Sequence, residues 1–230
     1  MKINSRLKTI ASLVPKDSYP LDIGCDHAML SIYLVKECNF SKVVASDDKE
    51  GPLLGAKKNI DFYHVKKNIQ LVQADGLEAY QDGVDVITIS GMGGILISQI
   101  FEKNKDVLEK VNTIILSPNN HTPLVRKELT KCGYRIEDEL LVKENKITYP
   151  ILVFKKGRGK YHSKDYYLGP VLSTKKEEII YKYYAKELKD QYQILLILPT
   201  LAIKRKFIQK RKIRWLKKVL KKFKRQNYIY

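Results

Sequence analysis

The sequence is poor in cysteine, and it lacks an apolar run long enough to cross a membrane. Among its 230 residues, Cys25, Cys38 and Cys132 have neither paired nor metal-type spacing. This excludes a disulfide scaffold and a zinc site and favours a reducing compartment. The apolar run at residues 10–14 is too short for a signal peptide or a membrane span. We therefore expect a cytoplasmic protein with no membrane segment and no metal.

Acidic residues are scarce in the last third of the chain. Residues 1–154 carry 20 basic and 20 acidic side chains, whereas residues 155–230 carry 23 and 5, so the whole net charge of +18 lies in the second part. Residues 200–230 contain 13 Lys or Arg and no acid. Such a run favours binding to a polyanion. A solvated charged face and a basic helix on a membrane surface are the alternative interpretations.

Glycine is missing where a dinucleotide-binding turn would need it. An apolar run that reads as a strand ends at Asp22, Ile23 and Gly24 and turns directly into an amphipathic helix. The dinucleotide fingerprint has three glycines, but here the second is replaced by Asp26. A carboxylate at that position repels phosphate and suits a cation. The turn therefore favours the sulfonium of S-adenosylmethionine over NAD, and the alternative is an ordinary strand-to-helix turn.

Apolar runs alternate with amphipathic segments through the first two thirds of the chain. Five strands are predicted, at residues 20–24, 42–46, 69–74, 84–89 and 113–116. Helices are predicted at residues 6–13, 28–37, 51–59, 95–103 and 123–132, and a hairpin of two strands at 134–143 and 146–155. This order predicts an α/β fold with a doubly wound, mainly parallel sheet, an antiparallel edge, and ligands at the carboxyl ends of the strands.

The composition changes after residue 155. A linker at 156–169 is predicted to lead into two amphipathic helices, 174–198 and 202–226, that form an antiparallel, coiled-coil-like hairpin. Their apolar stripes are Ile180, Tyr184, Leu188, Leu195 and Leu198 in the first helix and Ile208, Trp215, Leu216, Val219, Leu220 and Phe223 in the second. We therefore predict two domains, residues 1–156 with the sheet and residues 157–230 with the basic helices.

Polar residues and glycines follow the predicted strands. Asp47 lies at the spacing of an acid that binds ribose hydroxyls, or is a surface acid in a turn. Asp75 could accept a hydrogen bond from an adenine amino group, or belongs to an Asp-Gly turn without a ligand. The glycines at 91, 93 and 94 would let backbone pass close to reacting atoms, or would serve close packing of helix on strand. His27 and Asn119 are of a type that more often caps structure than catalyses, and Cys25 reads as a packing residue.

These motifs together resemble the bacterial tRNA (adenine-N1)-methyltransferase family that modifies adenine 22 of the D-arm. The resemblance rests on Asp22-Ile23-Gly24-Cys25-Asp26-His27-Ala28, Gly51-Pro52, Asp75-Gly76-Leu77, Gly91-Met92-Gly93-Gly94, Pro118-Asn119, Arg126 and Gly169-Pro170. It implies a Rossmann-like class I fold, S-adenosylmethionine as cofactor, tRNA as substrate and 1-methyladenine as product. The chain departs from the family at Met29, where Tyr is usual, and at Ser117, where Gln is usual.

The resemblance, the chemistry of the strand ends and the basic run together suggest roles for individual residues. The cofactor would be lined by Asp22, Gly24, Cys25, Asp26, His27, Asp47, Asp48, Asp75, Gly76, Gly91 and Met92. Asp26 is the candidate catalytic acid, and Asn119 is a candidate orienting acceptor. The RNA would be contacted by Arg6, Arg126, Arg211, Arg214, Lys217, Lys218, Lys221 and Lys222. We expect a monomer without a protein partner; the alternative function is a non-catalytic RNA-binding module on a degenerate methyltransferase fold.

Overall fold

The computed structural model describes residues 1–227 and the side chains up to Phe223. The chain divides into two compact units, Met1–Gly159 and Lys160–Tyr230. The sequence analysis places the boundary after residue 156. Each unit has its own packed interior, so each is described separately below.

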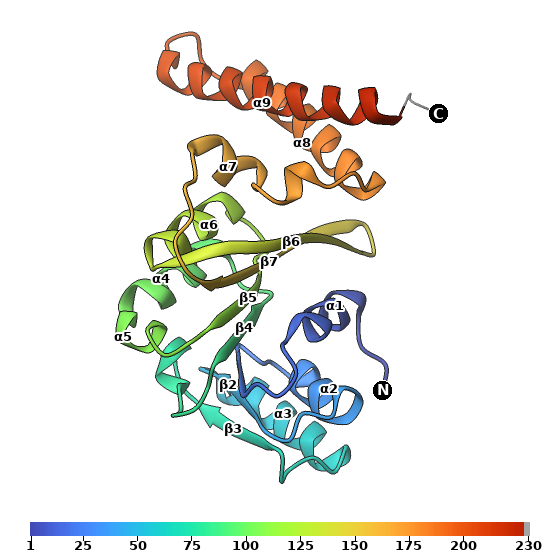
Figure 1. The fold of residues 1–230 in the computed structure, drawn as a ribbon, viewed down its shortest axis with the longest axis vertical. Coiled ribbons are helices and arrows are strands. Elements are labelled where there is room, and N and C mark those ends of the chain that lie inside the picture. Colours follow the sequence, from blue (N-terminus) through green and yellow to red (C-terminus); the bar gives the residue numbers. More distant parts are fainter. Residues whose placement is uncertain (228–230) are drawn as a thin grey trace. The chain divides into compact units, whose positions relative to one another are not determined.

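A seven-stranded sheet forms the centre of the first unit (Figure 1). Its strands are β1 (Pro20–Ile23), β2 (Val43–Asp47), β3 (Ile69–Gln73), β4 (Val86–Ser90), β5 (Thr113–Ser117), β6 (Tyr134–Glu144) and β7 (Ile147–Lys156). Their order is β3-β2-β1-β4-β5-β7-β6, with β1 to β5 parallel and β7 antiparallel to both β5 and β6. The order reverses between β1 and β4, and ligands of such sheets bind at this switch point. The predicted doubly wound sheet with an antiparallel edge is confirmed.

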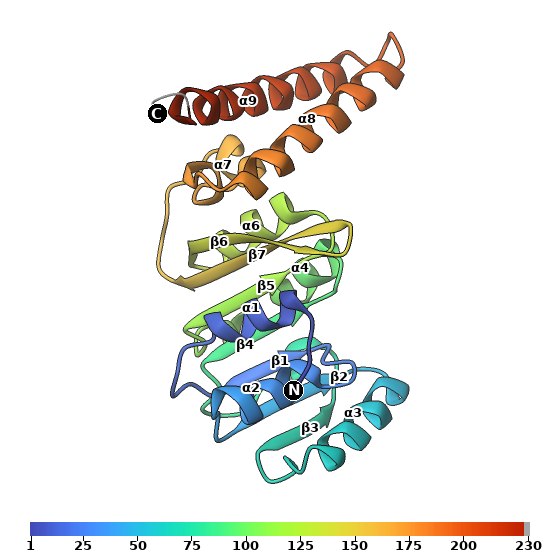
Figure 2. The same cartoon turned by 90° about the vertical axis from the view of Figure 1, so that its right-hand side faces the viewer.

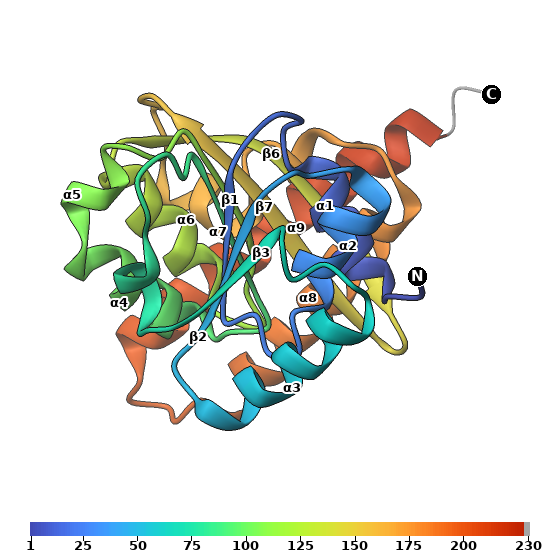
Figure 3. The same cartoon turned by 90° about the horizontal axis from the view of Figure 1, so that it is seen from below.

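Helices cover both faces of this sheet (Figure 3). One face carries α1 (Ser5–Leu13), α2 (Met29–Cys38) and α3 (Glu50–Phe62), and the other carries α4 (Gly94–Lys103), α5 (Lys105–Leu108) and α6 (Thr122–Lys131). Strands β1, β2 and β5 are buried at every position. They read as continuous apolar runs because helices pack on both sides of them. β3 is followed only by the 3-10 turn η1 (Gly76–Ala79), as the short connection in the sequence predicts.

The second unit contains two long helices in contact, α8 (Glu178–Ile197) and α9 (Ile203–Asn227). They run antiparallel (Figure 2), and Ile180 and Tyr184 of α8 are buried, as are Leu216, Val219 and Phe223 of α9. Gln209 Nε2 of α9 donates to the backbone carbonyl of Gln191 at 3.2 Å. None of the helices in the described part of the chain is long and apolar enough to span a membrane.

Three local predictions in this part of the chain are wrong. The expected linker at 156–169 contains helix α7 (Ser163–Leu168), in which His162 and Asp165 form a capping box. The 3-10 turn η2 (Leu172–Thr174) follows, so α8 begins at Glu178 rather than at residue 174. Ile208, expected on the buried stripe, is 37% exposed. Helix α7 is too short to show the apolar periodicity that predicts a helix, so the capping residues were its only local signal.

Candidate active site

A carboxylate from the end of β2 holds the turn that follows β1. Gly24 has a φ of 68°, which favours glycine, and a Cβ added there would lie 2.2 Å from Met92 Cε. The Asp47 carboxylate accepts hydrogen bonds from the backbone N–H groups of Asp26 and Lys49, each at 3.1 Å. The two neighbouring strands are thereby joined at their carboxyl ends, where the sequence predicts the ligand.

Asp22 supports the same region from within the sheet. Its carboxylate is 3% exposed, with Oδ2 accepting from Ser31 Oγ and Oδ1 from Thr88 Oγ1, both at 2.9 Å. Burial raises the pKa of Asp22 from 3.8 to about 6, against the two hydrogen bonds, and the negative charge of Asp47 adds to the rise. The Asp22 side chain is therefore held inside the sheet by Ser31 and Thr88, and its place beside the cofactor stays a prediction.

The pKa of Asp22 makes stability depend on pH. Because its folded pKa of about 6 exceeds 3.8, this carboxyl contributes most to stability below pH 3.8, and the contribution is lost as pH rises through 6. Ionised Asp22 then lowers the free energy of unfolding by about 3 kcal/mol at neutral pH. We expect Asp22→Asn to raise the free energy of unfolding by about 1–3 kcal/mol at pH 7.5, and to raise it less at pH 4.5, in urea titrations.

The control for this measurement is Asp17→Asn, at an exposed aspartate of the same unit. It should change the free energy of unfolding little at either pH. Equal destabilisation by Asp22→Asn at both pH values would show that the two hydroxyls need a carboxylate and that its ionisation carries no penalty.

His27 lies against α3 at a glycine. A Cβ on Gly55 would lie 2.4 Å from His27 Nδ1, so a side chain at position 55 would displace the ring. Asn59 Nδ2 donates to the backbone carbonyl of His27 at 2.9 Å, and His27 Nε2 lies 3.7 Å from Asp26 Oδ1. The sequence analysis missed Gly55 and Asn59, because nothing local to a helix reports which distant ring packs on it.

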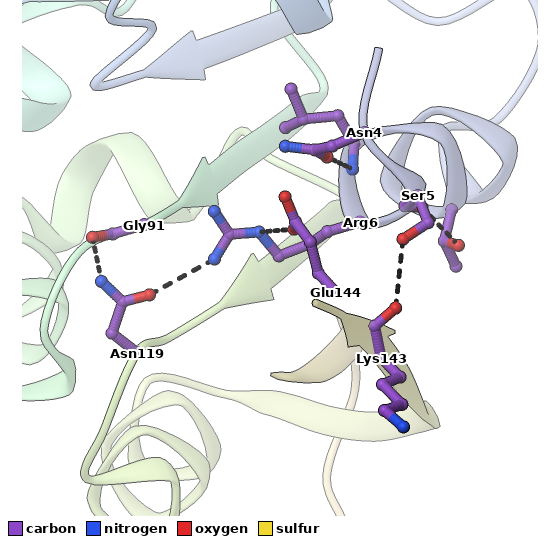
Figure 4. A network of polar contacts seen from close by, with 9 residues as sticks. Asn4, Ser5, Arg6, Gly91, Asn119, Lys143 and Glu144 are labelled. Atoms are coloured by element: carbon purple, nitrogen blue, oxygen red, sulfur yellow. Dashed lines mark hydrogen bonds and ion pairs between the residues drawn. The ribbon is translucent and has the colours of Figure 1, made fainter. Parts of the chain in front are cut away.

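Asn119 is fixed against the loop that follows β4. Gly91 has a φ of 84°, and its N–H donates to the carbonyl of Ser117 at 3.2 Å. The Asn119 backbone N–H donates to the carbonyl of Met92 at 2.9 Å, and its side-chain Nδ2 donates to the carbonyl of Gly91. The ends of β4 and β5 are therefore joined through Asn119 (Figure 4).

The glycines after β4 are needed for different reasons. Gly91 adopts a left-handed backbone conformation. At Gly94, by contrast, an added Cβ would lie 2.5 Å from the backbone oxygen of Asn120. Asn120 Oδ1 accepts from the N–H of Gly94 at 3.1 Å, at the start of α4. Gly94 thus serves close packing, the alternative that the sequence left open.

Arg6 reaches this site from α1. Its Nη1 donates to Asn119 Oδ1 at 3.3 Å, its Nε lies 3.7 Å from Glu144 Oε2, and its guanidinium carbon lies 4.3 Å from the centre of the Tyr149 ring. Figure 4 shows Arg6 between Asn119 and Glu144. Glu144 and Tyr149 lie on the two hairpin strands, far from Arg6 in sequence, and no sequence signal identified them.

Comparisons with known proteins match this geometry. The model of the tRNA (adenine(22)-N(1))-methyltransferase family matches residues 20–222. The chain belongs to this family. The Bacillus subtilis (strain 168) tRNA (adenine(22)-N(1))-methyltransferase is 35% identical over 201 residues, 84% of each protein. The crystal structure of the B. subtilis m1A22 tRNA methyltransferase TrmK has a TM-score of 0.87 and 32% identity, over 95% of this chain and 99% of that one.

A second relative holds the cofactor. The Streptococcus pneumoniae protein Sp1610, solved in complex with S-adenosyl-L-methionine, is 34% identical with a TM-score of 0.87, over 95% of this chain and all 100% of that one. The predicted family, the class of enzyme and S-adenosylmethionine as its cofactor are therefore confirmed. These findings do not support the alternative of a non-catalytic module.

The strand ends of the methyltransferase fit this cofactor. Asp26, Asp48 and Asp75 are exposed carboxylates at the ends of β1, β2 and β3. Their charge suits a cationic sulfonium and its polar substituents, and the backbone at Gly24 is open to a ligand except for the Met92 side chain. Met92 is flexible enough to move, since a thioether side chain has three rotatable bonds.

Two other residues predicted to line the cofactor, Cys25 and Gly76, are buried. Cys25 is 7% exposed, and burial raises the pKa of its thiol, so it is a packing residue and not a nucleophile. Gly76 is buried with a φ of 56°, and a Cβ there would lie 2.9 Å from Ile100 Cγ2. At both positions only the main chain, and not a side chain, can border the site.

The prediction that Arg126 contacts RNA is wrong. Arg126 is 3% exposed and Glu139 is fully buried, and Arg126 Nε donates to Glu139 Oε1 at 2.6 Å. A buried arginine is paired because an isolated charge is costly inside a protein. The spacing of Arg126 within an amphipathic helix gave no sign that it faces inward.

The other predicted RNA-binding residues of the methyltransferase, apart from Arg6, lie on α9. A shallow groove along this helix is lined by Lys210, Ile213, Arg214, Lys217, Lys218 and Lys221. Arg211 and Lys222 are exposed beside it, and the Arg211 guanidinium carbon lies 5.0 Å from the centre of the Trp215 ring. We call the basic residues of this groove, together with Arg211 and Lys222, the basic row.

Proposed function

We propose that the strand ends of the first unit transfer a methyl group to N1 of adenine 22 in tRNA, and that the basic row holds the tRNA. Family membership supports the reaction. The observation that supports the site is the joining of β1, β2, β4 and β5 at their carboxyl ends by Asp47 and Asn119. A rigid junction of this kind is what orientation of two reactants requires.

The chemistry needs alignment more than a strong base. S-adenosylmethionine, when bound, supplies an electrophilic methyl group. Adenine N1 is a neutral nucleophile, but it lies on the Watson–Crick edge, so the base must be unpaired and turned into the site. Methylation leaves the adenine cationic, and a nearby carboxylate or carbonyl stabilises that charge. The residues of this chain act by holding the base in position and by stabilising the positive charge of the methylated adenine.

Asn119 and Asp26 are suited to these two roles. Asn119 Oδ1 accepts one hydrogen bond from Arg6 and has a second lone pair, which can accept from the exocyclic amine of adenine. Asp26 is exposed beside the Gly24 turn, where its carboxylate can stabilise a cationic product. Arg6, held by Glu144 and Tyr149, both orients Asn119 and offers its remaining N–H groups to RNA.

The second unit supplies the long-range attraction for RNA in this proposal. Residues 1–154 are neutral, with 20 basic and 20 acidic side chains. Contacts between Lys or Arg and phosphates dominate non-specific affinity for nucleic acids. We further propose that the enzyme acts as a monomer in the cytoplasm, because tRNA is its substrate and no step above calls on a second subunit.

Methyl transfer to a defined nucleotide tests the function. An unmodified tRNA transcript should take up about one methyl group per molecule from labelled S-adenosylmethionine, and reverse transcriptase should stop at adenine 22, because N1-methylation blocks pairing. A matched transcript with guanine at that position should remain unlabelled. Binding of tRNA without any methyl transfer would instead favour the RNA-binding module.

A further inference from the structure

The turn between α8 and α9 exposes the most apolar stretch of the second unit. Residues 194–203 contain no charged side chain. Leu196, Ile197, Leu201, Ile203 and Phe207 are 76%, 79%, 91%, 75% and 66% exposed. We call these five residues the apolar tip; they lie on the turn and on the adjoining ends of α8 and α9, which are visible in Figure 2. Isolated exposed apolar residues are ordinary, whereas several within one short segment indicate an interaction surface.

The apolar tip does not complete the packing of α8 on α9. The buried contacts of that pair lie elsewhere, at Ile180 and Tyr184 of α8 and at Leu216, Val219 and Phe223 of α9. Leu195 and Leu198, predicted on the shared stripe, are only partly buried. The apolar tip therefore extends beyond the packed part of the helix pair and is available for contact with a partner.

The charges next to the apolar tip select the kind of partner. Lys204, Arg205 and Lys206 lie between Ile203 and Phe207 of the apolar tip, and the basic row begins three residues after Phe207, at Lys210. At 1.5 Å per residue, cations extend over about 26 Å of α9 from Lys204 to Lys221. Residues 200–230 contain no acid, so a symmetric contact between the α9 helices of two copies would bring like charges together. A lipid surface needs an apolar face along the helix beside its cations, but Leu216, Val219 and Phe223 of α9 are buried.

We propose that the apolar tip packs against exposed base faces of tRNA while the basic row contacts its phosphates. This inference rests on the proposed function of the second unit. Bases have flat apolar faces, and unstacked bases of folded RNA are the ones that proteins contact through apolar and aromatic side chains. A long polyanion with such a face at one end matches both surfaces of α9, and the contact would select folded tRNA over an extended strand.

Neutral substitutions separate this contact from the electrostatic one. The triple variant Ile197→Gln, Leu201→Gln and Ile203→Gln removes apolar surface without changing charge, at positions that the fold leaves exposed. We expect its Kd for tRNA to rise about ten- to hundredfold, because contact with bases would bury part of three apolar side chains. This range corresponds to about 1.4–2.8 kcal/mol, which is close to the contribution of one such side chain when it is fully buried. The plot of log affinity against log salt should shift in parallel, because its slope counts phosphate contacts.

A matched control carries Leu54→Gln and Phe62→Gln on α3, which are 54% and 73% exposed in the first unit. It should bind tRNA as the wild type does, and both variants should keep wild-type affinity for S-adenosylmethionine and wild-type helical circular dichroism. An unchanged Kd in the triple variant overturns the proposal. So does an unchanged Kd combined with lost self-association in sedimentation, or with lost binding to phosphatidylserine vesicles, since the apolar tip would then serve another partner.

The proposed function and this inference fail in different ways. Reversal of charge in the basic row tests phosphate contacts alone. If that reversal weakens tRNA binding and the triple variant does not, the second unit still binds tRNA and the base contact is overturned. If neither variant weakens binding, both proposals are overturned.

Discussion

Reversing the charge of Lys217, Lys218, Lys221 and Lys222 to glutamate is expected to weaken tRNA binding by about a hundred- to a thousandfold near physiological salt. Three of these lysines line the groove on α9, and Lys222 is exposed beside it. Each phosphate contact contributes about 0.7–0.9 to the slope of log affinity against log salt. Loss of four contacts should therefore reduce the slope by about 3, as measured by filter binding or fluorescence anisotropy from 50 to 300 mM salt.

The chain offers a control with the same change in charge. Lys57, Lys58, Lys66 and Lys67 are exposed in the first unit, and their replacement by glutamate also lowers the net charge by 8. If general charge governed binding, this control would weaken binding equally. We expect it to retain most of the salt slope, because these lysines lie outside the basic row. A wild-type slope in the α9 variant would make the basic row a solvated face.

Both variants should keep their folds and their cofactor. The substitutions on α9 leave the buried stripe of Leu216, Val219 and Phe223 untouched. The S-adenosylmethionine site lies in the first unit, so its affinity should stay at the wild-type value in calorimetric titration. A loss of cofactor affinity would indicate unfolding and would disqualify the variant as a test of RNA binding.

Sequence patterns predicted most of the sheet because burial on two faces leaves a clear signal. Continuous apolar runs marked β1, β2, β4 and β5, and a turn residue or acid marked the end of each. Asp47 was identified as a strand-end acid, but not its hydrogen bonds to the N–H groups of Asp26 and Lys49. Those bonds depend on which strands are neighbours, which local sequence does not report.

The parts that could not be predicted are those that depend on distant partners. Arg126 and Arg6 are both arginines in amphipathic helices, yet one is buried against Glu139 and the other reaches Asn119. Their different roles follow from where β6 and β7 place Glu139 and Glu144. Sequence alone gives both the same description, because the charged partner lies on a strand whose register is fixed only by the folded sheet.

Replacing Asn119 by alanine is expected to lower the turnover of the methyltransferase by about a hundred- to a thousandfold, the range seen when one oriented polar group is removed from an active site. Its amide joins the loop after β4 to Arg6 through Nδ2 and Oδ1, so alanine removes both the proposed acceptor for adenine and the fixed position of Arg6. Asn119 is exposed at the carboxyl end of β5, so the loss of stability should be small.

The control for Asn119→Ala is Asn112→Ala at the opposite end of β5. Asn112 is also exposed, and its backbone N–H and carbonyl are paired with Asp85 and Lys156, so this variant should keep wild-type turnover. Single-turnover rates of methyl transfer, measured with saturating tRNA and S-adenosylmethionine, separate chemistry from binding. A group that acts on the reacting base lowers this rate and leaves the Kd of S-adenosylmethionine within about twofold. If Asn119→Ala instead raises that Kd at an unchanged single-turnover rate, Asn119 belongs to the cofactor site and another group must orient the adenine.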